Sequence, residues 1–275
     1  MSNTLGDKTS TFPRRLLFEA LHNITTRRYD PYLSAPFEDA LQQRLHITGA
    51  VDTEAYLDYL ASNDEEGRIL ERRALVGVTQ FFRDSEEFAA LSDHIQDLLV
   101  ATSGRAQPLQ IWVPACSTGQ EAYSLAILLR ELSAEHTRTP SARIVASDIN
   151  AEAIEFARAG CFRRRQLHSL DVDYRDRYFR GEGEHWQVAE ALRQSLWFFV
   201  HDVLDPAPFD ELDIISCRNL LIYLRPAYQH RILRTFARTL RPGGLLFLGA
   251  SETTISDCDH FHQPHPHHRI YVLKS

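Results

Sequence analysis

The run Leu109-Gln-Ile-Trp-Val-Pro-Ala-Cys-Ser-Thr-Gly-Gln-Glu121 is the clearest sign of the fold in this sequence. Its first five residues form a short apolar segment typical of a buried β-strand, and a helical pattern follows over residues 121–132. The small residues between them, with Gly119, allow the backbone to approach a ligand closely, in front of the free N–H groups of a helix N-terminus. Taken alone, an ordinary strand-to-helix turn explains this segment equally well.

Strand and helix patterns alternate along the rest of the C-terminal part. Further strands are expected at residues 143–147, 196–200, 212–216 and 245–249, and further helices at 85–100, 151–159 and 226–240. Strands that alternate with helices in this way predict βαβ units and a parallel sheet covered on both faces. The segment Arg241-Pro-Gly-Gly244 predicts the end of the helix at 226–240 and a turn after it. Residues 269–273 show an alternating pattern, as an antiparallel edge strand would.

The N-terminal part has a different pattern. Residues 14–74 contain no strand-like alternation and read as helices. Three apolar residues spaced four apart, Phe37, Leu41 and Leu45, predict one buried helix face.

This change of pattern predicts an all-α N-terminal domain at residues 1–75 and an α/β domain at residues 76–275. Within the second domain the strand–helix rhythm is lost between residues 163 and 195. That segment is polar and contains Gly181-Glu-Gly183, so we expect it to form a small inserted β-subdomain.

Composition excludes several classes of protein. The chain has 275 residues, of which 44% are hydrophobic and 24% charged, so a disordered chain, a collagen-like fibre and a disulfide scaffold do not fit. The apolar runs are too short for a transmembrane helix, and the N-terminus lacks a signal-peptide core, which predicts a cytoplasmic protein with no direct membrane insertion. A net charge of −7 argues against nucleic acid as a partner. The acidic excess lies in residues 1–100, which hold 17 acidic and 10 basic groups.

Neither cysteine nor histidine spacing favours a metal site. The four cysteines lie far apart without a C-x-x-C pair and read as reduced thiols. The stretch His260-Phe-His-Gln-Pro-His-Pro-His-His268 is rich in histidine, but its prolines disfavour a regular element that would hold two imidazoles on one face. We expect this stretch to be a loop, with a metal site as the less favoured alternative.

Four features with polar side chains follow predicted strands, at the sheet edge where ligands bind in open parallel sheets. The first is the loop 114–121. The second is Asp148, whose carboxylate can accept both hydroxyls of a ribose; the alternative is that Asp148 or Asn150 caps the helix at 151–159. The third is Asp202, which could face an adenine amine or be an ordinary loop carboxylate. The fourth is the segment Cys217-Arg-Asn-Leu-Leu-Ile-Tyr223, whose polar groups need partners.

Together these features indicate an adenosine cofactor without a pyrophosphate. The loop after the first strand is neither G-x-G-x-x-G nor G-x-x-x-x-G-K-[ST], so both common phosphate-binding motifs are missing. S-adenosyl-L-methionine fits such a site. The segment Asn219-Leu-Leu-Ile-Tyr223 lacks the prolines expected of a nucleic-acid amino-methyltransferase.

From about residue 15 to 273 the sequence resembles the CheR-type chemotaxis receptor glutamate methyltransferases. The segments that carry the resemblance occur in the family's order: Gly77-Val-Thr-Gln-Phe-Phe-Arg-Asp84, Ile111-Trp-Val-Pro-Ala-Cys-Ser-Thr-Gly-Gln-Glu-Ala-Tyr-Ser124, Ala146-Ser-Asp-Ile-Asn150, Ile215-Ser-Cys-Arg-Asn-Leu-Leu-Ile-Tyr-Leu224 and Arg241-Pro-Gly-Gly-Leu-Leu-Phe-Leu-Gly-Ala-Ser-Glu252. The pair T-x-F-F-R and C-R-N-x-x-I-Y is the most distinctive. The resemblance implies a Rossmann-like S-adenosylmethionine-dependent methyltransferase sheet with a β-subdomain insert after the helical domain.

The resemblance also implies roles for individual residues. Those implied to bind the cofactor are Gly77, Thr79, Arg83, Ala115, Glu121, Asp148, Asp202, Val203, Arg218 and Asn219. Glu121 would meet the methionine end, Asp148 the ribose and Asp202 the adenine. Arg83 and Tyr223 would be the catalytic pair at the methyl-transfer centre. Gly77 replaces an Asn that is common in the family, so any side-chain contact there is lost.

The implied reaction forms γ-methyl esters on glutamates of a methyl-accepting receptor's cytoplasmic region, with S-adenosyl-L-homocysteine as the product and the enzyme acting as a monomer. Such a glutamate is already ionised at neutral pH, so no general base is required. Two rival hypotheses stay open: a catalytically silent domain that senses S-adenosylmethionine, and a methyltransferase for another carboxylate or a small molecule. The acidic helical domain keeps the second one open, because the family's well-studied members have a basic one.

Overall fold

In the computed structural model of the chain, the described residues are 13–75, 79–102, 105, 107–135, 142–252 and 259–274. They form two compact units. One unit holds the described residues up to Leu75 together with the later segment Tyr223–Arg225, and the other holds the remaining described residues. The segment Tyr223–Arg225 thus counts with the N-terminal helices although it lies far along the sequence.

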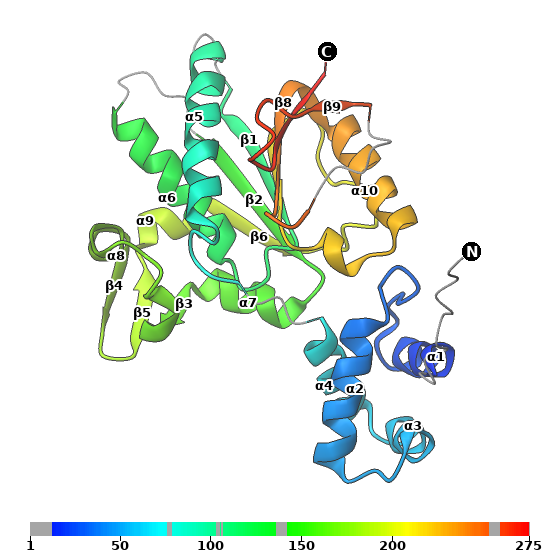
Figure 1. Ribbon diagram of the computed structural model, residues 1–275. Coiled ribbons are helices and arrows are strands. Elements are labelled where there is room, and N and C mark those ends of the chain that lie inside the picture. The colour runs from blue at the N-terminus through cyan, green and yellow to red at the C-terminus, as the bar shows by residue number, and fades with distance from the viewer. Residues whose placement is uncertain are drawn as a thin grey trace, which may run out of the picture. The chain divides into compact units, whose positions relative to one another are not determined.

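The helical unit contains, among its described residues, α1 (Arg14–Thr25), α2 (Ala35–Thr48), α3 (Thr53–Ala61) and α4 (Asp64–Ala74) (Figure 1). The Asp52 side chain caps α3 by accepting the N–H of Ala55. Within this unit Pro31–Leu33 pairs with Tyr223–Arg225 through an antiparallel bridge and two backbone hydrogen bonds of 2.8 Å.

The buried face of α2 differs from the predicted apolar stripe at one position. Phe37 and Leu41 are buried as predicted, but Leu45 is only half-buried and its neighbour Arg44 is buried. Arg44 can be buried because its Nε and Nη2 donate to the two carboxylate oxygens of Glu66 at 2.7 and 2.6 Å. This bidentate pairing replaces the water that the guanidinium loses on burial.

The second unit is built on a sheet of seven strands in the order β6-β2-β1-β7-β8-β10-β9 (Figure 1). The strands are β1 (Leu109–Pro114), β2 (Ala142–Asp148), β6 (Leu196–Val200), β7 (Leu212–Cys217), β8 (Leu240–Leu248), β9 (Phe261–His262) and β10 (Ile270–Leu273). The neighbours from β6 to β8 pair in parallel, as predicted, and β10 runs antiparallel to β8. The prediction that residues 269–273 form an edge strand is wrong, because β9 pairs with β10 and lies at the edge.

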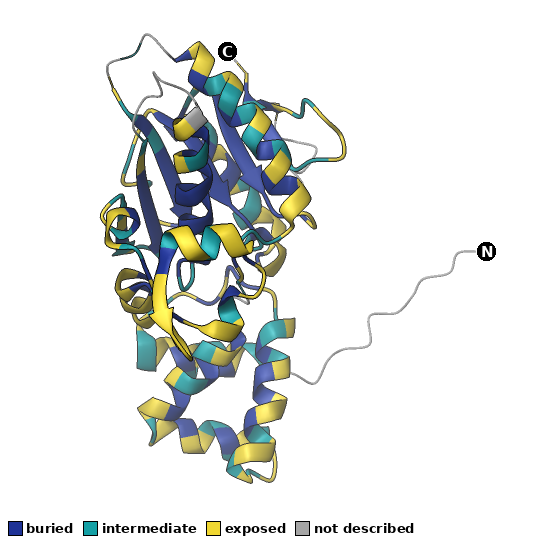
Figure 2. Cartoon of the chain, turned by 90° about the vertical axis from the view of Figure 1, so that its left-hand side faces the viewer, coloured by how far each residue is buried: buried dark blue, intermediate teal, exposed yellow. Residues whose placement is uncertain are grey.

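Helices cover the two faces of this sheet unequally. Apolar residues of α5 (Ser85–Ala101), α6 (Gln120–Glu135) and α7 (Ala151–Ala159) pack with β1 and β2 into the large core on one face. On the other face Trp112 packs edge-on against Phe236 of α10 (Pro226–Thr239). The central strands β1 and β7 are buried on both faces, as predicted, while the connection 201–211 contains no helix. Figure 2 shows the strands buried and the outer helix surfaces exposed.

The polar segment near residues 163–195 forms a second, three-stranded antiparallel sheet in the order β3-β5-β4. Its elements are β3 (Cys161–Arg163), η1 (Arg164–Leu167), α8 (Val172–Tyr178), β4 (Phe179–Glu182), β5 (His185–Val188) and α9 (Glu190–Arg193). Phe162 and Phe179 join the core of the main sheet through Phe81. This small sheet is thereby fixed to the main sheet by aromatic packing.

Two irregularities affect the ends and edges of the main sheet. β8 begins at Leu240, and its register against β7 shifts over residues 241–244, so the predicted helix stop and turn appear as an irregularity within a strand. At the β6 edge, the Arg158 guanidinium donates to the outward carbonyl of Phe198 at 2.7 and 3.1 Å.

No helix of the described residues is long and apolar enough to cross a lipid bilayer.

Candidate functional site

The loop after β1 has an unusual backbone. Ala115 and Ser117 both have positive φ, 54° and 51°, and Gly119 has a φ of 94°. A Cβ at position 119 would also lie 2.9 Å from the Cβ of Ala157. Both the positive φ and this close approach therefore require glycine there. Left-handed residues other than glycine cost of order 1 kcal/mol each and cluster at functional sites. The sequence signal of small residues therefore corresponds to a strained turn at the carboxyl end of β1.

Asp148 holds this turn in place from the end of β2. One carboxylate oxygen accepts the N–H of Ser117 at 2.8 Å, and the other accepts the N–H of Asn150 at 2.8 Å. The cap of α7 is Asn150, whose side chain accepts the N–H groups of Glu152 and Ala153. Of the two capping alternatives for this segment, the structure selects Asn150, and Asp148 lies instead between the first two strand ends.

Glu121 and Arg218 form the buried charged centre of this sheet edge. The Glu121 side chain, at the start of α6, is 14% exposed, and the Arg218 side chain, after β7, is 1% exposed. Their closest charged atoms are 4.0 Å apart, and the Ser216 hydroxyl donates to Glu121 at 2.6 Å. Burial raises the pKa of Glu121 to about 7, although the charges of Arg218 and Arg83 and the Ser216 hydrogen bond act to lower it.

Arg218 is buried but only partly satisfied. Its Nη2 donates to Asp84 at 2.6 Å, and its guanidinium carbon lies 5.2 Å and 4.7 Å from the ring centres of Phe88 and Phe247. Among the described residues, its Nε and Nη1 have no hydrogen-bond partner, although both atoms are buried. Because buried donors are rarely left unpaired, the N–H groups of these two nitrogens indicate a place for an acceptor from a bound ligand.

The linker that leads into α5 crosses the same region. Phe82 and Asp84 have positive φ, 47° and 57°, and the Phe82 N–H donates to the Ser124 hydroxyl of α6 at 2.9 Å. Arg83 and Thr79 are half-buried, and Arg83 is near enough to Glu121 for its charge to lower the pKa of that carboxyl. Gly77 lies outside the described residues.

The remaining predicted residues divide between the two units. Asp202 follows β6 and accepts the N–H of Leu204 at 2.9 Å, and Val203 beside it is half-buried. Asn219 follows Arg218 with a φ of 58°. Tyr223 ends the short turn η2 (Leu221–Tyr223) and belongs to the helical unit, so its catalytic role stays a prediction.

Sequence reasoning missed three polar residues at this edge: Asp84, Ser216 and Glu252. Asp84 pairs with Arg218. Ser216 and Glu252 lie within motifs that carried the family resemblance, so position within those motifs was the available signal. Their buried contacts join residues far apart in the chain, which spacing does not reveal.

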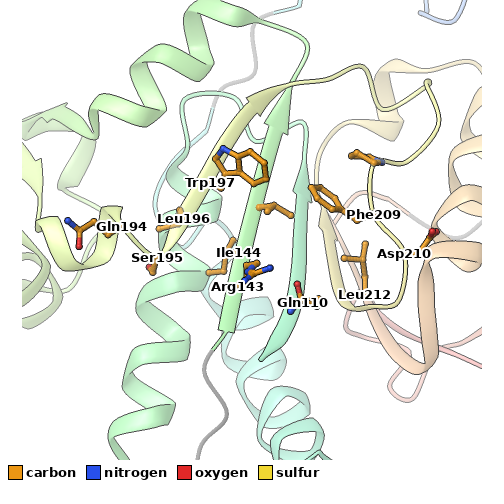
Figure 3. Close-up of a pocket in the computed structure, with 12 residues that line it drawn as sticks. Gln110, Arg143, Ile144, Gln194, Ser195, Leu196, Trp197, Phe209, Asp210 and Leu212 are labelled. Atoms are coloured by element: carbon orange, nitrogen blue, oxygen red, sulfur yellow. The ribbon is translucent and has the colours of Figure 1, made fainter. Parts of the chain in front are cut away.

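A groove of about 570 Å³ opens at the opposite end of the sheet (Figure 3). Its lining includes the first residues of β6 and β7 and the second residues of β1 and β2: Leu196, Leu212, Gln110 and Arg143. Trp197, 63% exposed, and Phe209 lie on its sides. Since ligands of open parallel sheets bind at the carboxyl ends of strands, this groove is separate from the site around Arg218.

No group of three metal-ligating side chains is found in the described parts of the chain. Cys116 and Cys217 are buried and Cys161 is half-buried, each as a free thiol, and Cys258 lies outside the described residues. In the histidine-rich stretch, Phe261–His262 forms β9, which corrects the expectation of a loop at that point, and residues 263–269 form a loop as predicted.

Comparison with known proteins gives a consistent family. Residues 77–269 match the family described as "CheR methyltransferase, SAM binding domain". The chain is 36% identical over 226 residues to a "Chemotaxis protein methyltransferase" of Klebsiella aerogenes, which covers 77% of this chain and 73% of that protein. It is 34% identical over 222 residues to the "Probable biofilm formation methyltransferase WspC" of Pseudomonas putida, covering 79% of this chain and 51% of that one.

A third relative is a much longer protein. The chain is 35% identical over 240 residues to an uncharacterized 104.1 kDa protein of Rhodobacter capsulatus. The match covers 87% of this chain but 25% of the relative. The chain therefore spans a quarter of one relative, about half of another and about three quarters of the third.

Proposed function

Because this chain belongs to the CheR methyltransferase family and carries its S-adenosylmethionine-binding domain, we propose that it forms γ-methyl esters on glutamates of chemotaxis-type receptors. The observation that carries the proposal is the buried, incompletely paired Arg218 beside Glu121, at the carboxyl ends of the parallel strands. The name of the Pseudomonas putida relative extends the range of signalling pathways to biofilm formation. The acceptor would lie in a receptor's cytoplasmic region, and the enzyme would act in the cytoplasm as a monomer.

The residues of this edge fit S-adenosylmethionine. Its methionine end carries a carboxylate and an ammonium group, and the buried Nε and Nη1 of Arg218 and the carboxylate of Glu121 offer the complementary charges. Asp148 stands at the second strand end, where a carboxylate can accept ribose hydroxyls, and Asp202 and Val203 follow the third strand for the adenine. Thr79, Ala115 and Asn219 complete the proposed set.

When bound, S-adenosylmethionine supplies a methyl group that is activated by its positively charged sulfur. An acceptor glutamate is already ionised at neutral pH, so the chain needs no general base. The proposed work of its residues is to hold the acceptor oxygen in line with the methyl group and to exclude water from it. Because the carboxylate loses charge in the transition state, a strong salt bridge to the acceptor would slow the reaction. Arg83 is therefore proposed to orient the cofactor, and Tyr223 to position the acceptor with one neutral hydrogen bond.

The test is methyl transfer from S-adenosylmethionine labelled in its methyl group to purified receptor signalling fragments. Esters on glutamate release the label as methanol in base, and a fragment whose acceptor glutamates are replaced by alanine serves as the control. Asp148→Ala should abolish binding of S-adenosylhomocysteine, while Tyr223→Phe should keep binding but slow methyl transfer. Binding without transfer to any receptor fragment would favour the silent sensor, and unchanged affinity in Asp148→Ala would contradict the ribose assignment.

A further inference from the structure

Glu252 is a buried carboxylate that is satisfied by backbone N–H groups. Its residue is 3% exposed. One of its oxygens accepts the N–H of Asn219 at 2.7 Å and that of Gly249 at 2.7 Å, and the other accepts the N–H of Leu221 at 2.6 Å. Charge-assisted hydrogen bonds to backbone N–H groups are among the strongest in proteins, and here three converge on one side chain.

These bonds join the loop after β8 to the loop after β7. Asn219 has a φ of 58°, in the left-handed region, which asparagine adopts more readily than most residues with a Cβ, and the bond from its N–H to Glu252 favours this conformation. Gly249 is fitted to the same contact: a Cβ there would lie 2.8 Å from the Glu252 carboxylate and 2.9 Å from the Asn219 nitrogen. Gly249 thus allows the carboxylate to reach the Asn219 backbone.

We propose that Glu252 is a positioning residue for cofactor binding, which holds the segment 218–221 in its binding conformation before the cofactor arrives. This inference rests on the proposed function, in which Arg218 and Asn219 contact S-adenosylmethionine. Glu252 acts through the backbone of that segment and does not itself contact the cofactor. Its charge also reaches the site, because it helps to raise the pKa of Glu121.

The test compares Glu252→Gln with Asp213→Asn. Asp213 is the control: it is 2% exposed, accepts the Gln110 N–H at 2.8 Å, forms an ion pair with Arg105 at 2.7 Å, and lies at the amino end of β7, away from the proposed site. Both substitutions replace a buried carboxylate by an amide of the same size. Glu252→Gln turns an N–H donor toward backbone donors, so we expect the dissociation constant of S-adenosylhomocysteine to rise at least about tenfold.

The measurement is isothermal titration at a temperature where circular dichroism shows each variant folded. Asp213→Asn should lower the melting temperature but change the dissociation constant less than about twofold, because it lies far from the segment 218–221. In turnover assays Glu252→Gln should raise the KM for S-adenosylmethionine more than it lowers kcat. Wild-type affinity in Glu252→Gln, or equal losses of affinity in the two variants, would overturn the proposal.

Hydrogen exchange of the unaltered protein tests the same idea when Glu252→Gln does not fold. The amides of Asn219 and Leu221 should exchange slowly before any ligand is added, because Glu252 already holds them. Fast exchange that slows only with S-adenosylhomocysteine would overturn the proposal, since the ligand would then order the segment. If the protein binds S-adenosylhomocysteine but methylates no receptor, the substrate assignment fails and the role of Glu252 stands.

Discussion

The two units each bury an arginine beside a glutamate, and the two pairs differ in how completely they are satisfied. In the helical unit, Arg44 and Glu66 form a bidentate pair at 2.6–2.7 Å, and the Tyr56 hydroxyl donates to the same carboxylate at 2.6 Å. In the sheet unit, Arg218 and Glu121 stay 4.0 Å apart, and the Nε and Nη1 of Arg218 have no hydrogen-bond partner among the described residues. The first pair is complete without any other molecule, and the second is not.

The pKa values of the two glutamates express this difference. Burial alone would raise the pKa of Glu66, but the hydrogen bonds from Arg44 and Tyr56 outweigh it and hold the pKa below its ordinary value. At Glu121 burial prevails and the pKa rises to about 7. A buried carboxylate that its own protein leaves poorly stabilised is a mark of a binding or catalytic site, whereas a fully paired one is a mark of structure.

Removing each arginine should give the largest contrast. Arg44→Met leaves Glu66 buried without its partner, so we expect the free energy of unfolding to fall by about 3–5 kcal/mol. Arg218→Met should cost the sheet unit less, because Glu121 can take up a proton, but it should abolish binding of S-adenosylhomocysteine. Thermal unfolding and isothermal titration of both variants check this. If the folded Arg44→Met variant lost ligand binding, the view that the Arg44–Glu66 pair serves structure alone would be wrong.

The pH dependence of stability should have opposite signs in the two pairs. Glu66, with its lowered pKa, stabilises the folded state above the ordinary glutamate pKa, and this contribution is lost as the pH falls through the folded value. For Glu121 the folded pKa is raised, so its contribution is present at low pH and is lost as the pH rises from about 4.5 to about 7. Melting curves of the ligand-free Glu66→Gln and Glu121→Gln variants, measured over a series of pH values, show which glutamate causes the change of stability in each pH range. If Glu121→Gln does not change how the melting temperature depends on pH near neutrality, the assignment of that range to Glu121 is wrong.

Ligand affinity should follow the ionisation of Glu121. A carboxylate with a pKa of about 7 gains charge across neutrality, so affinity for the ammonium end of S-adenosylmethionine should rise from about pH 6 to pH 8. Titrations over this range measure the rise, and Glu66→Gln is the control that should keep it. A flat profile in the unaltered protein would place the ammonium group away from Glu121.

Removing the hydroxyl that donates to each glutamate should give the smallest effects. Tyr56→Phe deletes a hydrogen bond to a charged group and should cost the helical unit about 2 kcal/mol. Ser216→Ala deletes a bond that lowers the pKa of Glu121, so it should move the rise in ligand affinity to higher pH with little change in melting temperature. Equal losses of stability in the two variants would indicate that both pairs are structural.

The sequence was informative where the cause is local. Short apolar runs predicted β1, β2 and β7 within a residue or two, and the pattern over residues 151–159 predicted the bounds of α7. The same rule brought Asp148 and Arg218 to one sheet edge, because parallel strands end on the same side.

What the sequence did not reveal depends on pairs that lie far apart in the chain. Arg44 is buried because it pairs with Glu66, 22 residues away, and nothing in its local sequence indicates that partner. Asp84 meets Arg218 across 134 positions, and the two-residue strand β9 is too short for any periodicity. Charged side chains occur at any exposed position, so their burial is visible only once the partner is placed.

The pairing of Pro31–Leu33 with Tyr223–Arg225 has a consequence for synthesis of the chain. The helices of the helical unit emerge from the ribosome before the sheet unit, but the last segment of the helical unit follows only after most of the sheet unit has been translated. At about 5–20 residues per second the delay is on the order of ten seconds. During that time the backbone of Pro31–Leu33 lacks its native partner. A recombinant fragment that stops before residue 223 would keep this edge exposed permanently, and we expect it to be more prone to proteolysis than the same helices in the full chain.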